Sequence, residues 1–493
     1  MAVRRGECKC HCEAQQQGER VNPEIGDPGE AARQRAQVRL VAHAWPPTLL
    51  DVLERLSADG QQAHLVGGSV RDVLLGRAMS GPWDIASSCT PEQVRERFAR
   101  VEPIGERHGT VLVLAPAVAC EVTTFRREGE YTDARRPDQV WFTRDPLADL
   151  ARRDLTVNAL AYDPRTGVLL DPHDGALDLE RCCLRAVGDP IARFREDALR
   201  PLRVARFAAV LGMQPEAGTR SALGAALDRS EALAVERVRA ELERMLTAVR
   251  PSDGIELLRE AGLLELWLPE LAACRGVPQN RFHAHDVYFH SVYSCDAAPA
   301  DKPVVRWAAL LHDIGKPATR EIRDGDATFY QHQFVGADLA DGLLERLRFS
   351  SRERAAIVHL VREHMFDYRP EWGDSAVRRW LQRVGVETVA DLFDLRLADS
   401  QGNGLKHGFP TYLDEFAARI ERVLSAHDAL CVADLALDGA EVMRILEIAP
   451  GEAVGEALTA LLERVIEHPE VNTPERLTAE LITWRAPTPR PHA

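Results

Sequence analysis

The stretch HLVGGSVRDVLLGRAMSGPWDIASS, residues 64–88, decides how the first part of the chain folds. An apolar run leads into the Gly67–Gly68 pair, and a short amphipathic stretch follows before a second apolar run. This order predicts a strand, a glycine turn, a helix and a second strand. In the second strand, WDIAS, alternation directs Asp84 to the face opposite its apolar neighbours. The stretch therefore predicts a tight turn close to an acidic side chain.

Another acidic strand is predicted at residues 120–125, CEVTTF, where Glu121 also alternates with apolar side chains. A short link joins this run to HGTVLVL, residues 108–114, and the two runs predict a hairpin. If the strands of Asp84 and Glu121 are neighbours, both carboxylates face one site. Carboxylates suit Mg²⁺, and nucleotide transfer to a 3′-hydroxyl uses two such ions about 3.5–4 Å apart. We therefore expect a Mg²⁺ site at these two residues.

The glycine pair has two interpretations. Gly67 and Gly68, followed by Ser69, let backbone N–H groups approach a phosphate where the predicted helix begins. Taken alone, however, two glycines before a helix favour a plain tight turn. Only the surrounding residues can favour a phosphate site.

Composition and charge exclude several classes of protein. The 493 residues allow several domains, and their formal net charge of −15 is not that of a non-specific nucleic-acid binder. Any polyanionic ligand must therefore be bound by local basic groups. No run of about 18 apolar residues predicts a membrane helix, and the N-terminus lacks the apolar core of a signal peptide. We expect a cytoplasmic protein that does not contact membranes.

The patterning changes along the chain. Strand and turn signals dominate to about residue 170, whereas apolar residues at helical spacing dominate from about Asp189 onward. The fold class predicted is α+β: a small mixed-sheet head followed by an all-helical remainder.

Several stretches occur in a characteristic order over roughly residues 60–250. They are LVGGSVRDVLLGR, WDIAS, RHGTV, CEVTTFRREGEYTDARRPDQVWF, DLARRDLTVNALAYDP, REDALRPLRVARFAA and ERVRAELERML. This series resembles the tRNA nucleotidyltransferase and bacterial poly(A) polymerase family, and within it the bacterial-type CCA-adding enzymes.

The resemblance implies a role for each matching residue. Asp84 and Glu121 would be the catalytic, Mg²⁺-binding carboxylates. The implied nucleotide-binding residues are Gly67, Gly68, Arg71, Arg152, Arg153, Asp154, Asn158, Asp197, Arg200 and Arg203. Among them, Asp197 and Arg200 would read the edge of cytosine or adenine from adjacent helical turns in place of a template. The alternative is an ordinary surface ion pair between residues three apart on a helix.

One residue departs from this family. Its members carry Asp-x-Asp in the strand of Asp84, but here Pro82 fills the first Asp position, or a one-residue insertion displaces it. Proline cannot bind a metal. Three explanations stay open: transfer has been lost while the fold is kept, another carboxylate substitutes, or the sequence carries a mutation or error. Asp72 is near, but the resemblance places it on a helix and not among the metal ligands.

A second set of metal-binding side chains is predicted in the helical half. Histidine and aspartate are embedded in separate amphipathic stretches that could converge: His290, His312, Asp313, His332, His364 and Asp399. An adjacent His-Asp pair after an apolar run is costly to bury unless a cation compensates. Imidazole and carboxylate ligands suit Ni²⁺, Mn²⁺ or another transition ion. We expect four other histidines of this half, His283, His285, His359 and His407, to be ordinary core or surface residues.

The order of these ligands, with LLHDIGKP at residues 310–317, resembles the HD phosphohydrolase superfamily. That resemblance implies metal-assisted hydrolysis of phosphate monoesters or 2′,3′-cyclic phosphates.

Together these features predict five parts and one main function. The parts are a disordered tail at 1–45, a nucleotidyltransferase head at 46–188, a helical neck and body at 189–278, an HD domain at 279–428, and a helical C-terminal region and tail at 429–493. The resemblance implies addition of C, A or both from CTP and ATP to the tRNA 3′ end, with a partner enzyme if the work is shared. A poly(A) polymerase and an HD hydrolase with an impaired head are the alternatives.

Overall fold

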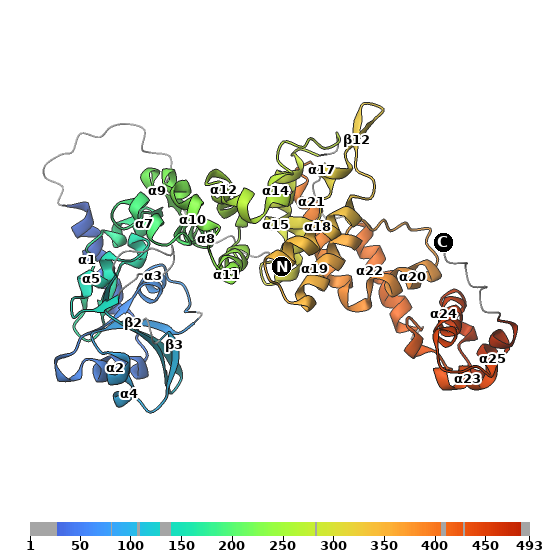
Figure 1. Ribbon diagram of the computed structural model, residues 1–493, viewed down its shortest axis with the longest axis horizontal. Coiled ribbons are helices and arrows are strands. Elements are labelled where there is room, and N and C mark those ends of the chain that lie inside the picture. The colour runs from blue at the N-terminus through green and yellow to red at the C-terminus, as the bar shows by residue number, and fades with distance from the viewer. Residues whose placement is uncertain are drawn as a thin grey trace. The chain divides into compact units, whose positions relative to one another are not determined.

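The computed structural model describes residues 27–79, 81–105, 109–128, 140–281, 283–405, 411–426 and 429–484. The chain divides into two compact units, Met1–Ala272 and Ala273–Ala493 (Figure 1). Strands and helices alternate in the first part of the first unit, and helices dominate elsewhere, so the predicted α+β fold is confirmed. Within the described ranges, no helix has both the length and the apolarity to cross a bilayer.

The head is built on a seven-stranded mixed sheet in the order β3-β4-β5-β2-β1-β8-β9. β2 and β5 run parallel, and the other neighbouring pairs of this sheet are antiparallel. β4 and β5 form the predicted hairpin. The strands are β1 (Ala63–Val66), β2 (Trp83–Ser87), β3 (Val101–Gly105), β4 (Thr110–Ala115), β5 (Val118–Thr124), β8 (Ala161–Asp163) and β9 (Val168–Leu170).

Helix α2 (Pro47–Leu56) precedes the first strand of the sheet. Its side chains Leu49, Val52, Leu53 and Leu56 are fully buried, and their three- and four-residue spacing places them on one face of the helix.

The prediction of a disordered tail over residues 1–45 is wrong for its last part. Residues Pro28–Ala42 form helix α1, which packs against the head, while residues 1–26 lie outside the described residues. Asp27 caps this helix by accepting a hydrogen bond from the N–H of Gly29. The buried stripe consists mainly of alanines, and such a stripe carries little of the apolar signal by which a helix is recognised in a sequence.

Helix α5 (Pro146–Ala151) lies on the face of the sheet that carries Asp84. Its Leu150 packs in one apolar cluster with Val66 and Ala86, and Ala86 is two residues from Asp84 on the same strand face. A short ribbon of β6 (Arg126–Glu128) and β7 (Val140–Phe142) precedes α5, and α3 (Gly68–Leu74) follows β1.

The rest of the first unit is helical apart from a two-residue pairing of β10 (Cys183–Leu184) with β11 (Gln214–Pro215), which the sequence did not predict. The helices are α4 (Pro91–Arg97), α6 (Gly175–Glu180), α7 (Pro190–Glu196), α8 (Arg200–Leu211), α9 (Ala217–Ser221), α10 (Leu227–Ser230), α11 (Val235–Leu246), α12 (Pro251–Glu260), α13 (Leu263–Trp267) and α14 (Pro269–Ala272).

The described residues of the second unit are helical except for a small hairpin of β12 (Glu321–Arg323) and β13 (Asp326–Thr328), which the sequence also did not predict. Helices α15, α16, α19 and α21 contact one another, and α23 to α25 form a separate apolar core. The helices are α15 (Val287–Ala297), α16 (Pro303–Leu311), α17 (Lys316–Thr319), α18 (His332–Arg346), α19 (Ser351–Glu363), α20 (Asp374–Val384), α21 (Val389–Gly402), α22 (Tyr412–Ser425), α23 (Gly439–Leu446), α24 (Glu452–Glu467) and α25 (Pro474–Thr483).

Candidate active site and metal centre

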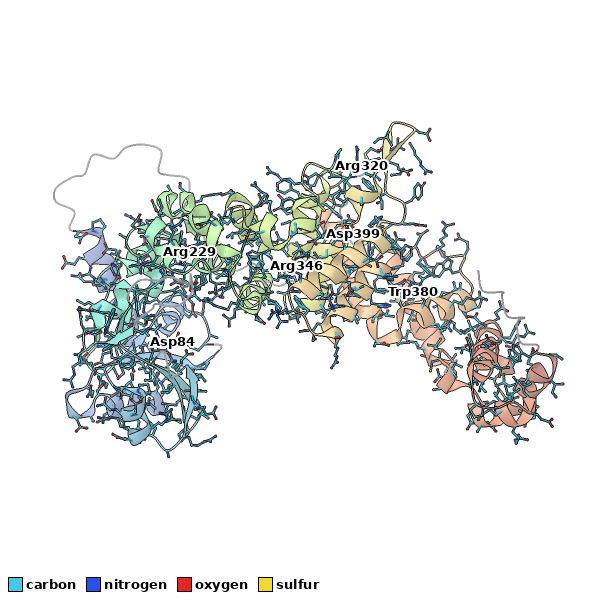
Figure 2. All side chains as sticks on the ribbon, viewed as in Figure 1. Asp84, Arg229, Arg320, Arg346, Trp380 and Asp399 are labelled. Carbon is cyan, nitrogen blue, oxygen red and sulfur yellow. The ribbon has the colours of Figure 1, made fainter. Side chains whose placement is uncertain are left out.

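Asp84 and Glu121 lie side by side in the head. They are direct register partners on the parallel strands β2 and β5, so their side chains leave the same face of the sheet. Figure 2 labels Asp84 on this sheet. Burial raises the pKa of Glu121, and the neighbouring Asp84 carboxylate raises it further. Burial also raises the pKa of Asp84, although Arg153 and Arg71 partly oppose the shift. Paired, partly buried carboxylates of this kind fit a hard divalent cation such as Mg²⁺.

The glycine turn touches this carboxylate pair. Gly67 has a φ of +58°, and a Cβ there would lie 2.8 Å from Nη1 of Arg153. A Cβ on Gly68 would lie 3.3 Å from Oδ2 of Asp84. Ser69, which is fully buried, accepts the backbone N–H of Asp84 at 2.7 Å through its hydroxyl oxygen. The turn therefore needs glycine both for its backbone angle and for the close approach of its neighbours.

Arg152 and Arg153 are held by an aspartate that the sequence analysis missed. Asp149 is 1% exposed and accepts hydrogen bonds from Nε of Arg152 at 2.9 Å and from Nη2 of Arg153 at 3.2 Å. Burial alone would raise the pKa of Asp149, but the two guanidinium groups outweigh burial and lower it. Asp149 precedes these arginines by three and four residues, a helical spacing that could have indicated the contact.

A chain of hydrogen bonds connects the remaining nucleotide-binding candidates. Arg71 donates to Oδ1 of Asn158 at 2.6 Å, and Nδ2 of Asn158 donates to Oδ1 of Asp154 at 3.1 Å. The other oxygen of Asp154 accepts from Nε of Arg203 at 2.7 Å. Burial opposes ionisation of Asp154, but Arg203 and Asn158 hold its pKa far below the usual range. The carboxylate therefore stays charged and fixes both of its partners.

Asp197 and Arg200 are not paired with each other through their side chains. Asp197 lies between α7 and α8 and accepts from Arg237 at 3.0 Å. Arg200 opens α8 and donates to the carbonyl of Arg152 at 3.1 Å and to the carboxylate of Glu196. The alternative of a surface ion pair between Asp197 and Arg200 is therefore wrong. The placement on adjacent turns of one helix is also wrong, because α7 ends before Asp197.

Pro82 is exposed and lies just before β2, outside its register with β5. Asp72, a carboxylate nearby in sequence, is bound at both oxygens by Arg71, through Nε at 2.9 Å and Nη2 at 3.0 Å. Asp72 therefore serves as the partner of Arg71 in this structure.

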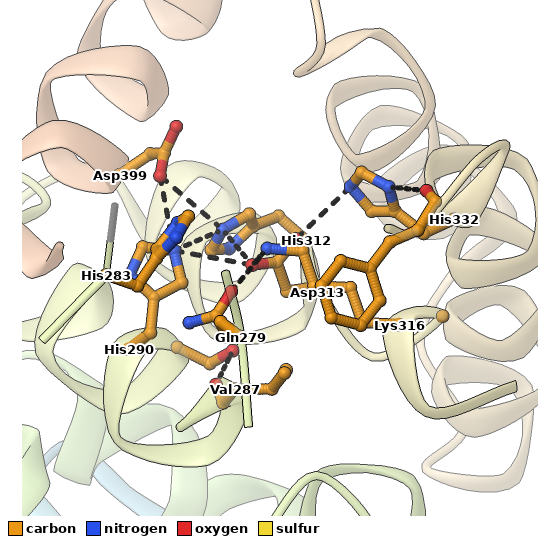
Figure 3. Close-up of polar contacts among 12 residues, drawn as sticks. Gln279, His283, Val287, His290, His312, Asp313, Lys316, His332 and Asp399 are labelled. Atoms are coloured by element: carbon orange, nitrogen blue, oxygen red, sulfur yellow. Dashed lines mark hydrogen bonds and ion pairs between the residues drawn. The ribbon is translucent and has the colours of Figure 1, made fainter. Parts of the chain in front are cut away.

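In the second unit, the predicted histidines and aspartates come together (Figure 3). Two groups have ligand atoms within 4.8 Å of one another: His290, His312 and Asp399, and Asp313, His332 and His364. Asp313 joins the groups, since its Oδ2 lies 3.3 Å from His290 and 3.2 Å from His312, and its Oδ1 lies 3.3 Å from His332.

The histidine rings are oriented by the backbone. Nδ1 of His312 lies 2.8 Å from the carbonyl of Ala309, and Nδ1 of both His332 and His364 lies 2.7 Å from a carbonyl three residues earlier. When each Nδ1–H donates to its carbonyl, each Nε2 carries a lone pair directed into the cluster. This orientation is the one in which proteins present imidazole to a metal ion, so the residues fit a transition metal.

The charges of His364 and Asp399 agree with that fit, whereas burial of the His312 ring is outweighed by the Asp313 carboxylate, which raises the pKa of His312. Burial lowers the pKa of His364 to about 3, and the nearby His312 and His332 add to the effect. Burial opposes ionisation of Asp399, yet His290 and His312 hold its pKa far below the usual range. A neutral imidazole and an ionised carboxylate are the forms that bind metals.

Lys316, Gln279 and His283 also lie close to this site, although the sequence analysis did not select them. Nζ of Lys316 lies 2.6 Å from Oδ2 of Asp313 and donates to Oε1 of Gln279 at 2.7 Å. The His283 ring is 5.4 Å from that of His290 (Figure 3), but His283 is in neither ligand group of the described residues, so its assignment as an ordinary residue stays a prediction. Burial lowers the pKa of His283 to about 4, and the positive charge of Lys316 contributes to the shift. His359 bonds to the carbonyl of Val384 instead.

His285 lies against Tyr293, outside the two ligand groups, whereas His407 lies outside the described residues. The spacing of Lys316, three residues after Asp313 in HDIGK, is the signal that could have identified it.

Three family models match parts of the chain. Residues 63–185 match the poly A polymerase head domain, residues 212–275 match the probable RNA and SrmB-binding site of polymerase A, and residues 282–400 match the HD domain.

Similar proteins share most of the chain. The CCA-adding enzyme of Lactococcus lactis subsp. lactis (strain IL1403) is 34% identical over 87% of this chain and 95% of its own length. That of Geobacillus thermodenitrificans (strain NG80-2) is 42% identical over 70% of this chain and 84% of its own length. The crystal structure of the Bacillus stearothermophilus CCA-adding enzyme in complex with CTP covers 89% of this chain with a TM-score of 0.68, 27% identity and 98% of that structure's chain. The chain therefore belongs to the family of CCA-adding enzymes, the nucleotidyltransferases that add C and A to the 3′ end of tRNA.

Proposed function

We propose that the nucleotidyl transfer of this chain takes place at Asp84 and Glu121, with CTP and ATP as donors and a tRNA 3′ end as acceptor. The observation that supports this most directly is the register pairing of the two carboxylates on parallel strands beside the Gly67 turn. Mg²⁺ ions bound there would activate the 3′-hydroxyl and neutralise charge on the triphosphate. The relative crystallised with CTP supports the choice of donor.

The side chains of the head assist in distinct ways. Arg71 and Arg153 flank Asp84, so their charges are placed to bind the triphosphate. In the reaction a bond forms between the 3′-oxygen and the α-phosphorus, the bond from that phosphorus to its bridging oxygen breaks, and pyrophosphate leaves. Asp197 and Arg200, held by Arg237 and Glu196, would present an acceptor and donors to the base edge.

The test is nucleotide addition to tRNA that lacks its CCA end. Purified protein with labelled CTP and ATP should add three nucleotides, and Asp84→Asn or Glu121→Gln should lower the rate by about a thousandfold or more. Glu102→Gln, which changes an exposed glutamate on β3 of the same sheet, is the matched control and should leave the rate unchanged.

Other products would contradict parts of the proposal. A long A tail would indicate poly(A) polymerase activity. Addition of C alone would indicate a partner enzyme that adds A. Unchanged rates in both carboxylate variants would show that the site lies elsewhere.

For the second unit we propose metal-dependent hydrolysis of phosphate monoesters or 2′,3′-cyclic phosphates, on the strength of the converging ligands around Asp313. Two neighbouring groups, with Asp313 of one close to His290 and His312 of the other, offer places for two ions, and imidazole with carboxylate suits Ni²⁺ or Mn²⁺. A bound ion would supply an activated water at neutral pH. Lys316, which is 7% exposed beside Asp313, can bind a phosphate oxygen.

This second activity is tested separately. Protein loaded with Ni²⁺ or Mn²⁺ should hydrolyse a nucleoside 2′,3′-cyclic phosphate, and chelation or His312→Gln should abolish hydrolysis. The control is His359→Gln, which changes a histidine of α19 that bonds to a backbone carbonyl. Hydrolysis that survives chelation or His312→Gln would show that this cluster is not the hydrolytic site.

A further inference from the structure

The beginning of strand β2 is held mainly from outside the strand. Pro82 has no backbone N–H, and pairing with β5 starts only at Trp83, which faces Cys120. The N–H of Asp84 is bound by the hydroxyl oxygen of Ser69 at 2.7 Å. Asp84 is thus the second residue of β2, and Pro82, the residue before this strand, cannot donate a hydrogen bond to the sheet.

Behind this strand lies Trp45, a residue from the link between α1 and α2. Its ring centroid is 5.8 Å from that of Trp83 in an edge-on contact and 5.6 Å from that of Tyr162 on β8. Trp83 and Tyr162 are both buried, at 9% and 1% exposure. Because side chains alternate along a strand, Trp83 points to the face opposite Asp84. Trp45 therefore packs against Trp83, on the face of the sheet opposite Asp84.

Trp45 itself is fixed on both sides. Its Nε1 donates to the carbonyl of Leu40 at 3.0 Å, and Leu40 is fully buried at the end of α1. The same helix is tied to the head by Arg35, which makes two hydrogen bonds to the carboxylate of Glu180 at 2.9 and 2.7 Å. The next helix, α2, is anchored by its buried leucines. The indole thus cannot withdraw from Trp83 without disturbing two packed helices.

We infer that Trp45 is a positioning residue for nucleotidyl transfer. By holding Trp83, it fixes the backbone of β2 at the point where Asp84 must stay in register with Glu121. The inference rests on the proposed roles of Asp84 and Glu121. Metal ligands need placement within about 0.5 Å, and a free strand end that follows a proline does not supply it. The segment before the head therefore contributes to the catalytic site without touching substrate.

The experiment compares Trp45→Ala with Trp45→Phe in the full chain. We measure kcat, the KM values for CTP and tRNA, the Mg²⁺ concentration for half-maximal rate, and the thermal midpoint. Trp45→Ala should lower kcat by about ten- to a hundredfold and raise the Mg²⁺ requirement severalfold, with the KM for tRNA unchanged. Trp45→Phe keeps a ring against Trp83 and should restore most of the rate.

A core truncation in the same head is the matched control. Val94 on α4 is 1% exposed, and Val94→Ala should lower the thermal midpoint without changing the Mg²⁺ requirement. If Trp45→Ala behaves like Val94→Ala, Trp45 is merely structural and the inference is wrong. Should Trp45→Ala fail to fold, Trp45→Leu gives the same comparison with a smaller volume change.

The experiments distinguish a wrong role for Trp45 from a wrong assignment of the catalytic carboxylates. If Asp84→Asn abolishes addition while Trp45→Ala keeps normal kcat and Mg²⁺ dependence, only the role of Trp45 is wrong. If Asp84→Asn itself remains active, the assignment of the catalytic carboxylates fails first.

Discussion

Pro82 is the residue at which this chain differs from the metal-binding pattern that it resembles. In the structure, Pro82 is exposed directly before β2, next to Trp83 and two positions before Asp84. The space for a further carboxylate is therefore at the surface of the site, where a substitution need not disturb the core.

We expect Pro82→Asp to raise the rate of nucleotide addition by about a hundredfold, because a further oxygen ligand stabilises the transition state by several kcal/mol. Single-turnover addition of CMP to tRNA measures this. The control is Gly81→Asp, which places a carboxylate at the adjacent exposed position. Unchanged rates in Pro82→Asp would show that Asp84 and Glu121 suffice.

Mg²⁺ should also affect the stability of the head through the same carboxylates. Their pKa values are raised in the folded state, so the stability they contribute is present at low pH and is lost as the pH rises through the raised values. Bound Mg²⁺ compensates the buried negative charge that causes this loss. Thermal unfolding at pH 7 should therefore show a higher midpoint with Mg²⁺, and Asp84→Asn should abolish the increase. An equal increase in both proteins would place the ion elsewhere.

The pH dependence of stability expected from Asp149 has the opposite sign. Its pKa is lowered in the folded state, so the stability it contributes is present above the ordinary value near 4 and is lost as the pH falls through the lowered value. Asp149→Asn should cost about 3 kcal/mol at pH 7, since it removes the partner of two guanidinium groups, and should raise the KM for CTP.

The difference in unfolding free energy between the Asp149→Asn and native proteins should shrink as the pH falls below about 4, which urea titration measures. Asp51→Asn, which changes a largely exposed residue on α2, is the control and should show no such trend. A difference that stays constant with pH would contradict the paired role of Asp149.

At the scale of elements, helix α1 joins the head through small side chains. Ala32 and Leu40 are fully buried on one face, while Val38 on the opposite face is 70% exposed. The helix therefore depends on tertiary packing more than on its own propensity.

Ala32→Asp should lower the free energy of unfolding by about 2–4 kcal/mol, because it buries an unpaired carboxylate. Val38→Asp on the same helix should change it by less than about 0.5 kcal/mol. Urea denaturation of both variants measures the difference. Equal values would show that α1 does not pack on the head in solution.

At the scale of the whole molecule, two sites occupy two compact units, each with its own buried core. The carboxylate pair lies in the first unit, and the histidine cluster lies in the second. Their side chains come from different units, so their chemistry should be separable.

His312→Gln should abolish hydrolysis of a cyclic phosphate and leave CMP addition within about twofold of the native rate, since additivity holds for sites that share no contacts. Asp84→Asn should give the reverse result. Parallel assays of both activities on each variant test this. Loss of both activities in either variant would indicate that the units depend on each other.

The sequence by itself determined the residue types and the local geometry of both sites. Alternation in WDIAS and CEVTTF placed Asp84 and Glu121 on definite strand faces, and the separate helical stretches predicted the histidines and aspartates that come together around Asp313. These predictions succeeded because side-chain direction follows from a period of two or 3.6 residues along the chain. Family membership then followed from the order of the motifs.

Only the tertiary structure decided which distant segments meet. The sheet order places β5 beside β2, Asp197 pairs with Arg237, and Trp45 packs behind Trp83. No periodicity in a sequence encodes such contacts, because they depend on how separate elements bury their apolar surfaces together. Strand neighbours, buried ion pairs and aromatic contacts between remote residues are therefore set by packing of the whole unit.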